Sequence, residues 1–305
     1  MQRREFLKYG ATALITCPWL AAAQSTDAKM NRIGCTTVAF RSRFAATRPK
    51  NVTPSGPDLD LLDVPAMFVE KLGIRNVELW SKHFPEATIA YGEKVRAAAA
   101  KAGARIINIQ QDEPPFDLPN PDAEKRRASI AVIKKWMDIA AACGATSLRA
   151  NTGGRPDEAF DLQTTTDSFR QLAEHGEKVG VKILVENHSG HSVKAENVAA
   201  IVRKVGSPWC RSLPDFGNVP AGFTTEQRIA FLNQILPLAH LISAKGMEFD
   251  ADYKHTSFDI AACVRAAEKS GFKGIYSIEL WAPKYTPSDP IRAVRTLTEE
   301  IVSNL

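Results

Sequence analysis

The chain has 305 residues, of which 44% are hydrophobic, so it is long enough to bury the core of one large domain. Its formal net charge of +5 is small, and part of it belongs to the first eight residues. The remaining charge is scattered along the chain, whereas proteins that bind nucleic acid gather basic residues on one face. No nucleic-acid partner is therefore expected.

The first residues have the features of an export signal. Arg3 and Arg4 precede a weakly hydrophobic run over residues 9–20, which is followed by three alanines. This order is typical of a twin-arginine signal peptide, so we expect residues 1–23 to be removed and the mature protein to be periplasmic. The run contains Pro18 and is shorter than the roughly 20 residues of a spanning helix, so we expect no stable membrane insertion after cleavage.

The cysteines do not form a disulfide pattern. Cys17 follows Thr16, which fits a lipoprotein cleavage site poorly. The other four lie singly within expected strands or helices: Cys35, Cys143, Cys210 and Cys263. An even number in an oxidising compartment permits disulfides, but isolated cysteines of this kind are more typical of buried apolar side chains.

One junction recurs along the rest of the chain. An amphipathic helix ends in a basic or small residue, a glycine follows, and a short run of Ile, Val and Leu begins, as over residues 71–79 and 101–109. Glycine suits the left-handed end of a helix, and continuous apolar runs are typical of parallel strands covered by helices. The expected strands are 32–38, 75–80, 105–110, 147–150, 182–186, 211–215, 240–245 and 274–280. The expected helices are 64–72, 87–102, 122–143, 165–179, 193–205, 225–236, 259–269 and 290–302.

Eight alternating strand–helix units predict a (β/α)8 barrel, the TIM barrel, as a single domain over residues 24–305. A doubly wound open sheet is the alternative, but it usually carries a glycine-rich phosphate loop after its first strand. Residues 36–42 contain no such loop. Residues 48–58 and 112–122 are long loops after the first and third strands, where a barrel has its catalytic face, so we expect them to act as substrate lids.

Four expected strands end in a carboxylate: Glu78, Glu186, Asp215 and Glu279. Each taken alone could be a salt-bridged acid at a loop edge, but in a barrel the carboxyl ends of all strands meet at one mouth. Clustered carboxylates repel one another unless a cation or a shared proton relieves them. Glu186, Asp215 and Glu279 therefore predict a divalent metal ion, and oxygen ligands favour Mn, Mg or Co.

Other polar residues at the strand ends are candidates for the site. Lys245 shares a strand face with Ser243, and it either stabilises an enediolate oxygen or pairs with one of the acids. His188 is either a metal ligand or a substrate contact. The expected substrate-binding residues are Glu78, His83, Arg149, Asn151, His188, Asn218 and Trp281. Three further histidines, His191, His240 and His255, are interpreted as ordinary loop or strand residues.

Five stretches together resemble a known family. They are Asn76–Trp80, Leu184–Gly190, Leu213–Asn218, Ile242–Lys245 and Ile278–Leu280. Their order is similar to that of the sugar phosphate isomerase/epimerase family, the xylose isomerase-like TIM barrels, and within it to the exported twin-arginine branch.

The resemblance implies an activity and a set of ligands. Epimerase-type members hold a divalent ion with Glu, Asp, His and Glu from strands five to eight, and their two glutamates act as acid and base. Here it implies Glu186, Asp215 and Glu279, but Ser243 stands where the ligand histidine is expected. Asn218 likewise stands where a histidine often follows the aspartate. His188 as a ligand and Lys245 as a charge are the two replacements left open.

The leading hypothesis is an isomerase or epimerase that acts on a free or oxidised sugar, with Glu186 and Glu279 as proton-transfer groups and metal ligands. A periplasmic location disfavours a phosphorylated sugar. The alternatives are a lyase or hydrolase that acts on keto-glycosides by β-elimination, and a non-catalytic sugar-binding barrel. An endonuclease-type barrel would need a histidine-rich mouth, and the chain has only 6 histidines. The expected partner is a small-molecule sugar or glycoside, and both a monomer and a homo-oligomer stay open.

Overall fold

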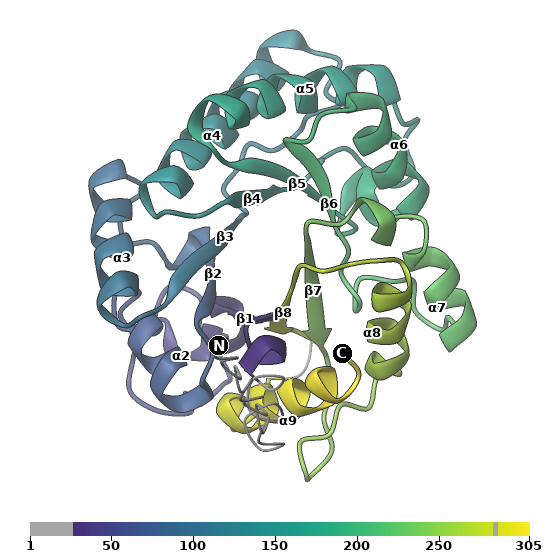
Figure 1. Cartoon of the computed structure of the whole chain (residues 1–305). Helices are drawn as coiled ribbons and strands as arrows, with labels where there is room; N and C mark the ends of the chain where they lie inside the picture. Colours follow the sequence, from purple (N-terminus) through teal and green to yellow (C-terminus); the bar gives the residue numbers. More distant parts are fainter. Residues whose placement is uncertain (1–26, 283–285) are drawn as a thin grey trace, which may run out of the picture.

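In a computed structural model, which describes residues 27–282 and 286–305, eight parallel strands form a nearly closed barrel with helices around it (Figure 1). The strands are β1 (Ile33–Thr36), β2 (Asn76–Trp80), β3 (Arg105–Gln111), β4 (Ser147–Ala150), β5 (Lys182–Glu186), β6 (Cys210–Leu213), β7 (Leu241–Gly246) and β8 (Ile275–Leu280). The helices are α2 (Val64–Leu72), α3 (Ile89–Lys101), α4 (Ala123–Ala142), α5 (Leu162–Val179), α6 (Ala195–Val205), α7 (Thr225–Leu232), α8 (Ile260–Lys269) and α9 (Pro290–Ser303). The prediction of a TIM barrel is confirmed.

The barrel closes between β6 and β7. The other strands pair continuously in the order β6-β5-β4-β3-β2-β1-β8-β7. The two end strands are joined only by isolated bridges, Ser212 with Ala239 and Asp215 with Ser243. The amide of Phe216 donates to the Ser243 carbonyl at 3.0 Å, and the Ser243 amide donates to the carbonyl of Pro214 at 2.9 Å. The seam of the barrel therefore lies at one of the predicted site carboxylates.

Several element boundaries differ from the sequence prediction. The first strand, expected over residues 32–38, ends at Thr36, because the Thr36 side chain accepts the amide of Val38 and starts the 3-10 helix η1 (Thr37–Arg43). The helix expected from 165 begins at Leu162 instead, because Asp161 caps it by accepting the amide of Thr164.

Two helices and one strand are also shorter than predicted. The helix expected over 193–205 is divided into the 3-10 helix η3 (Gly190–Val193) and α6, because Lys194 between them is extended. The helix expected over 225–236 ends at Leu232, and Asn233 is its C-terminal capping residue. The strand expected over 211–215 ends at Leu213.

The recurring helix-end glycines have the conformation that the sequence predicts. Gly73, Gly180 and Gly206 have φ values of 69°, 75° and 64° at the ends of α2, α5 and α6. A left-handed residue here turns the chain from the helix toward the next strand, and a side chain with a Cβ atom disfavours that conformation.

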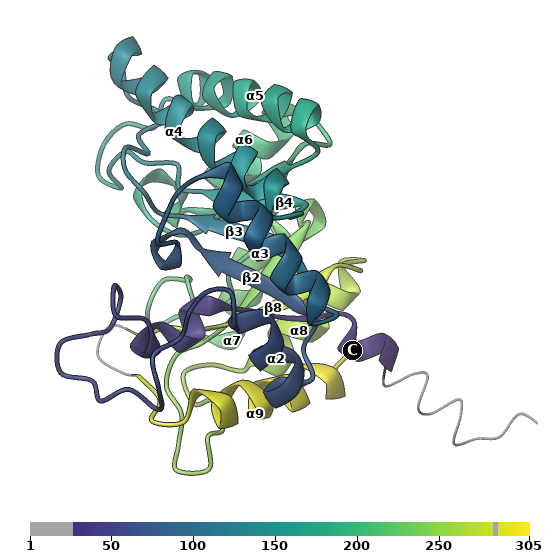
Figure 2. The ribbon, with the colours of Figure 1, turned by 90° about the vertical axis from the view of Figure 1, so that its left-hand side faces the viewer.

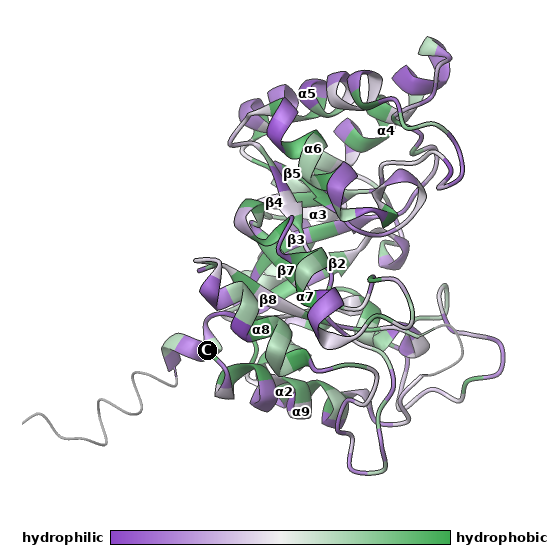
Figure 3. Cartoon of the chain, turned by 90° about the vertical axis from the view of Figure 1, so that its right-hand side faces the viewer, coloured by the Kyte–Doolittle hydropathy of each residue, from purple (hydrophilic) through white to green (hydrophobic). Residues whose placement is uncertain are grey.

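The apolar residues form two separate cores. The larger one fills the layer between the strands and the surrounding helices, and Figure 3 shows apolar colour facing inward on the helices. The smaller one is a plug inside the barrel, made of Ile107, Leu184, Leu213 and Leu241 with Ile275 packed against it.

The plug fixes where the polar site begins. Side chains on a strand alternate between its two faces, so residues two and four positions beyond the plug also point into the barrel. That places Glu186 above Leu184, Ser243 and Lys245 above Leu241, and Glu279 above the plug end of β8. In Figure 2 the connection between η1 and α2 projects from this end of the barrel, opposite the C-terminus.

The cysteines within the described residues are free and buried, as predicted: Cys35, Cys143, Cys210 and Cys263. Cys17 and the expected signal peptide lie outside the described residues. Over residues 27–282 and 286–305, none of the helices combines the length and the apolar character needed to cross a membrane.

Shortening a plug residue should weaken the whole barrel. Leu184 is fully buried, so Leu184→Ala removes apolar contacts and leaves a cavity, and we expect the free energy of unfolding to fall by about 2 to 5 kcal/mol. Ile89 is 54% exposed on α3, so Ile89→Ala is the control and should change it little. Chemical denaturation measures both. Equal effects of the two variants would contradict the plug.

Candidate functional site

Three carboxylates lie at the carboxyl ends of neighbouring strands. Glu186 ends β5, Asp215 follows β6, and Glu279 lies in β8, and each is at least 94% buried, with exposures of 2%, 0% and 6%. Lys245 of β7 and Arg149 of β4 are buried beside them. The structure therefore brings together all the acids that were predicted to form the metal site, but with two cations of the chain itself.

The ammonium group of Lys245 lies among three oxygens. Its Nζ is 2.8 Å from Oε1 of Glu279 and 3.8 Å from Oδ2 of Asp215. It also donates a hydrogen bond to Oδ1 of Asn218 at 3.1 Å. Burial by itself lowers the pKa of Lys245, but Asp215 and Glu279 outweigh it and raise the pKa, so the side chain carries its charge.

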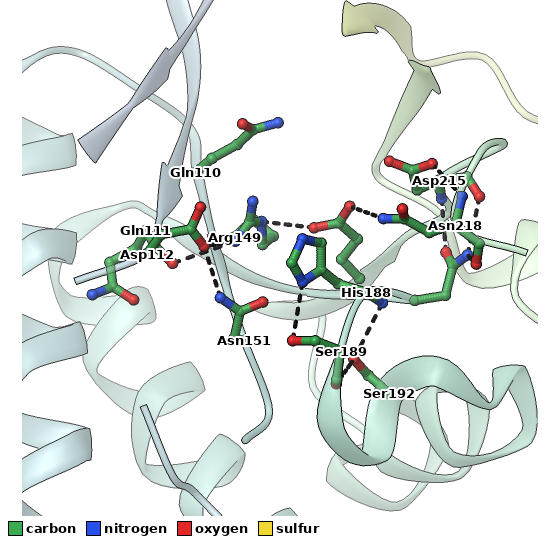
Figure 4. A network of polar contacts seen from close by, with 12 residues as sticks. Gln110, Gln111, Asp112, Arg149, Asn151, His188, Ser189, Ser192, Asp215 and Asn218 are labelled. Carbon is green, nitrogen blue, oxygen red and sulfur yellow. Dashed lines mark hydrogen bonds and ion pairs between the residues drawn. The ribbon is translucent and has the colours of Figure 1, made fainter. Parts of the chain in front are cut away.

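Arg149 lies between two acids on the other side of the mouth (Figure 4). Its Nε is 2.7 Å from Oε2 of Glu186, an ion pair whose atoms do not meet the geometry of a hydrogen bond. Its Nη1 donates to Asp112. Asp112 also accepts hydrogen bonds from Asn151 Nδ2 at 2.7 Å and from Trp80 Nε1 at 2.6 Å. Burial opposes the charge on Asp112, but Arg149 outweighs it and leaves its pKa well below the ordinary value.

Asn218 connects the two halves of this network. Its Nδ2 donates to Oε1 of Glu186 at 3.1 Å, while its Oδ1 accepts from Lys245. The loop that carries it is fixed by Asp215, whose Oδ1 accepts the amides of Gly217 at 2.7 Å and Asn218 at 2.8 Å. Asn187 holds the same loop by donating to the carbonyls of Asp215 and Asn218.

The two glutamates have pKa values shifted in opposite directions. Burial raises the pKa of Glu186 to about 7, against the opposing effect of Arg149. Burial also favours a raised pKa for Glu279, but Lys245 and Gln110 outweigh it and the pKa is lowered. Burial likewise raises the pKa of Asp215 to about 7, so near neutral pH Glu279 is ionised while Glu186 and Asp215 each hold a proton part of the time. Such a pair is able to supply a base and an acid in one site.

The donor set does not fit the divalent ion that the family resemblance implies. Within residues 27–282 and 286–305, no group of three or more His, Cys, Asp and Glu side chains is arranged to hold a metal ion. An ion at the oxygens of Asp215 and Glu279 would lie near the Lys245 ammonium. Two unit charges 4 Å apart repel by about 4 kcal/mol at an effective dielectric constant of about 20, and a divalent ion doubles that value.

His188 lies within the network, and Figure 4 shows its ring between Arg149 and Asn218. Its Nδ1 is 3.1 Å from the Ser189 hydroxyl. Burial, with Arg149 and Lys245 nearby, lowers the pKa of His188 to about 4, so the ring is neutral near pH 7. This placement suits a substrate contact.

Two other predicted residues have different surroundings. His83 is buried with its Nδ1 2.9 Å from the Thr37 hydroxyl and its Nε2 2.9 Å from the Thr47 hydroxyl, so both ring nitrogens have partners. Trp281 lies against Trp80, and the guanidinium of Arg41 covers its ring at 3.8 Å.

Glu78 lies deeper in the barrel than the other acids. Its Oε1 accepts from Asn108 Nδ2 at 2.6 Å, and its Oε2 accepts from the Ser277 hydroxyl. Burial raises the pKa of Glu78 to about 7. With both oxygens engaged and an exposure of 1%, Glu78 supports the layer beneath the site.

Sequence reasoning missed two residues from β3 and its end. Gln110 donates to Oε2 of Glu279 at 2.9 Å, and Asp112 pairs with Arg149. Both stand at a strand end, so the rule that selected the other carboxylates would have selected Asp112 as well. The contact with Trp80 depends on the register between the neighbouring strands β2 and β3 and has no signal in the sequence.

A cavity of about 810 Å³ lies beside this network rather than over it. The loops after β3 and β4 form it, together with His191 from η3, and its lining includes Phe116, Asn120 and Gly153. None of the carboxylates of the mouth lines it. The loop at 112–122, which was expected to be a lid, thus forms a wall of this cavity.

Comparisons with known proteins agree with the fold. The family model of the xylose isomerase-like TIM barrel matches residues 67–300. A 3-keto-D-glucoside 4-epimerase from E. coli has a TM-score of 0.64 at 14% identity, covering 89% of this chain and 99% of that one. A xylose isomerase-like TIM barrel protein from Mycobacterium smegmatis, in complex with magnesium, has a TM-score of 0.64 at 16% identity, covering 91% and 98%. A D-psicose 3-epimerase has a TM-score of 0.59 at 12% identity, covering 81% and 91%. No curated protein matches the chain in sequence.

The raised pKa of Glu78 predicts a pH-dependent stability. The folded chain holds its proton up to about pH 7 while the unfolded chain loses it near 4.5, so stability falls as the pH rises between these values. Glu78→Gln carries no charge, and it still pairs with both neighbours, because its oxygen accepts from Asn108 and its nitrogen donates to the Ser277 hydroxyl. The free energy of unfolding of this variant, relative to that of the wild type, should rise by up to about 3 kcal/mol from pH 4 to pH 8. Urea denaturation at both pH values tests this, with the exposed Glu93→Gln as control. The same difference in free energy of unfolding between Glu78→Gln and the wild type at both pH values would contradict the raised pKa of Glu78.

Proposed function

Because the chain belongs to the xylose isomerase-like TIM barrel family, we propose that it is a sugar isomerase or epimerase that acts on a free or keto-sugar. The observation that carries the proposal is the pair of buried glutamates with pKa values shifted in opposite directions on either side of Lys245. Epimerases among the similar structures support the same reaction class.

The proposed reaction moves one proton at a carbon next to a carbonyl group. Glu279 removes the proton from that carbon, and the electron pair moves onto the carbonyl oxygen to give an enediolate. Lys245 donates a hydrogen bond to this oxygen as its negative charge develops, which is where fixed charges contribute most to catalysis. Glu186 returns a proton to the carbon, and the two glutamates then exchange protons with water to reset the site.

The remaining residues of the network hold the reacting groups in place. Arg149 keeps Glu186 oriented, and Asp112 keeps Arg149 in position through a direct ion pair. His188 and Asn151 lie within reach of substrate hydroxyl groups at the same mouth. We propose further that the protein is exported by its twin-arginine leader, in which case a non-phosphorylated sugar is the natural substrate.

The cavity beside the mouth favours a second candidate reaction. It is formed by the loops that begin next to Asp112 and Asn151, and its volume of about 810 Å³ suits a group attached to the reacting sugar. A keto-glycoside that forms an enediolate in this site is able to lose its aglycone by β-elimination. This candidate uses the same base, Glu279, and differs in the fate of the intermediate.

A panel of free ketoses and 3-keto-glycosides tests the proposed activity, with products identified by NMR. We expect an epimer or isomer to form, and we expect Glu279→Gln to lower kcat by about 100- to 10,000-fold because the base is lost. Exposed Glu93→Gln is the matched control and should keep the wild-type rate.

The product pattern separates the candidates. Release of aglycone without an epimer would replace the isomerase by the lyase. A chain that binds these sugars with equal affinity before and after Glu279→Gln, and that converts none of them, would be a non-catalytic binding protein.

A further inference from the structure

We propose that the ammonium group of Lys245 permanently occupies the place of a catalytic divalent cation, so that this barrel works without a metal ion. The role of the ammonium in turnover rests on the proposed function. Its occupation of the cation position is a separate claim that binding measurements test directly.

The surroundings of Lys245 are those of a coordinated cation. Its Nζ faces one oxygen each from Glu279, Asn218 and Asp215, at 2.8, 3.1 and 3.8 Å. An ammonium group has three N–H donors, so hydrogen bonds to Glu279 and Asn218 leave one donor for a substrate oxygen, while Asp215 lies at ion-pair distance. The remaining acid, Glu186, is paired with a different cation, Arg149. Each carboxylate of the mouth therefore already faces a positive charge from the chain.

The backbone makes room for the stem of this lysine. A Cβ atom added to Gly217 would lie 2.8 Å from Cδ and 3.0 Å from Cγ of Lys245. Heavy atoms are not tolerated at such distances, so any larger residue at 217 would displace the lysine. Gly217 acts as a positioning residue that fixes where the ammonium lies.

The two neighbouring polar residues suit an ammonium rather than a metal ion. Ser243, one inward-facing position before Lys245, carries a hydroxyl that is a weak ligand compared with imidazole. Asn218 donates from its nitrogen to Glu186 and accepts from Lys245 through its oxygen. A single amide thus joins an acid to the ammonium, and its oxygen, the atom through which an amide would bind a metal ion, already accepts from Lys245.

Metal binding by the purified wild-type protein is the first test, with Mn(II) as the probe. We expect the electron paramagnetic resonance signal of added Mn(II) to stay that of the free ion, and we expect sugar turnover to be unchanged after dialysis against EDTA. One tightly bound equivalent of Mn(II), or activity that EDTA removes and Mn(II) restores, would overturn the proposal.

Variants then locate the effect at Lys245. Removing the ammonium and supplying an imidazole, in the double variant Ser243→His/Lys245→Ala, should create a Mn(II) site that the wild type lacks. Lys245→Met should lower kcat by about 100- to 1,000-fold, the usual loss for one donor to a developing oxyanion. Lys182→Met is the control, because Lys182 packs over Trp209 at the start of β5 and does not reach the mouth.

Gly217→Ala provides a test that keeps every charge. We expect kcat to fall while circular dichroism and KM stay close to the wild type, since only the position of the ammonium changes. A wild-type rate in this variant would argue against a fixed ammonium. If no sugar of the panel is converted, the proposed function fails, whereas the Mn(II) measurements on the wild type and the double variant still decide the occupation of the cation position.

Discussion

The barrel depends on the pairing of four acids with two buried cations at its mouth. Glu186, Asp215 and Glu279 are almost fully buried, and without compensation their charges would oppose folding. Lys245 faces Asp215 and Glu279, while Arg149 faces Glu186 and Asp112. These contacts join β4, β5, β7 and β8 with the loop that follows β6, so the same interactions complete the barrel and assemble the site.

This pairing also explains the chemistry available there. One cation lies beside each glutamate, but burial leaves Glu186 with a raised pKa whereas Lys245 and Gln110 lower that of Glu279. Glu186 and Glu279 have the same side chain, so the difference between their pKa values comes from their surroundings. Proton transfer in one direction needs such a difference, and a site of two equally ionised carboxylates would not provide it.

The sequence predicted the fold and most of the acids of the site, because both depend on local patterns. Glycines after helices and apolar runs before carboxylates are visible at each junction, and the strands of a barrel bring their carboxyl ends together. The sequence did not reveal how charges are shared. Whether Lys245 pairs with Glu279 depends on β7 and β8 lying in register, and the link from Trp80 to Asp112 depends on the neighbouring strands β2 and β3. The sequence also did not reveal the partners of His83, which was selected because it lies near a strand end. Its two ring nitrogens lie next to the hydroxyls of Thr37 and Thr47.

The step that we propose for this mouth is the transfer of a proton at carbon. Incubation of the protein with a substrate of the panel in D2O, followed by mass spectrometry of the recovered sugar, measures that step directly. We expect one carbon-bound deuterium to enter the sugar, with and without EDTA present. Recovery of the sugar with its carbon-bound hydrogens unexchanged, under conditions where it is bound or converted, would contradict it.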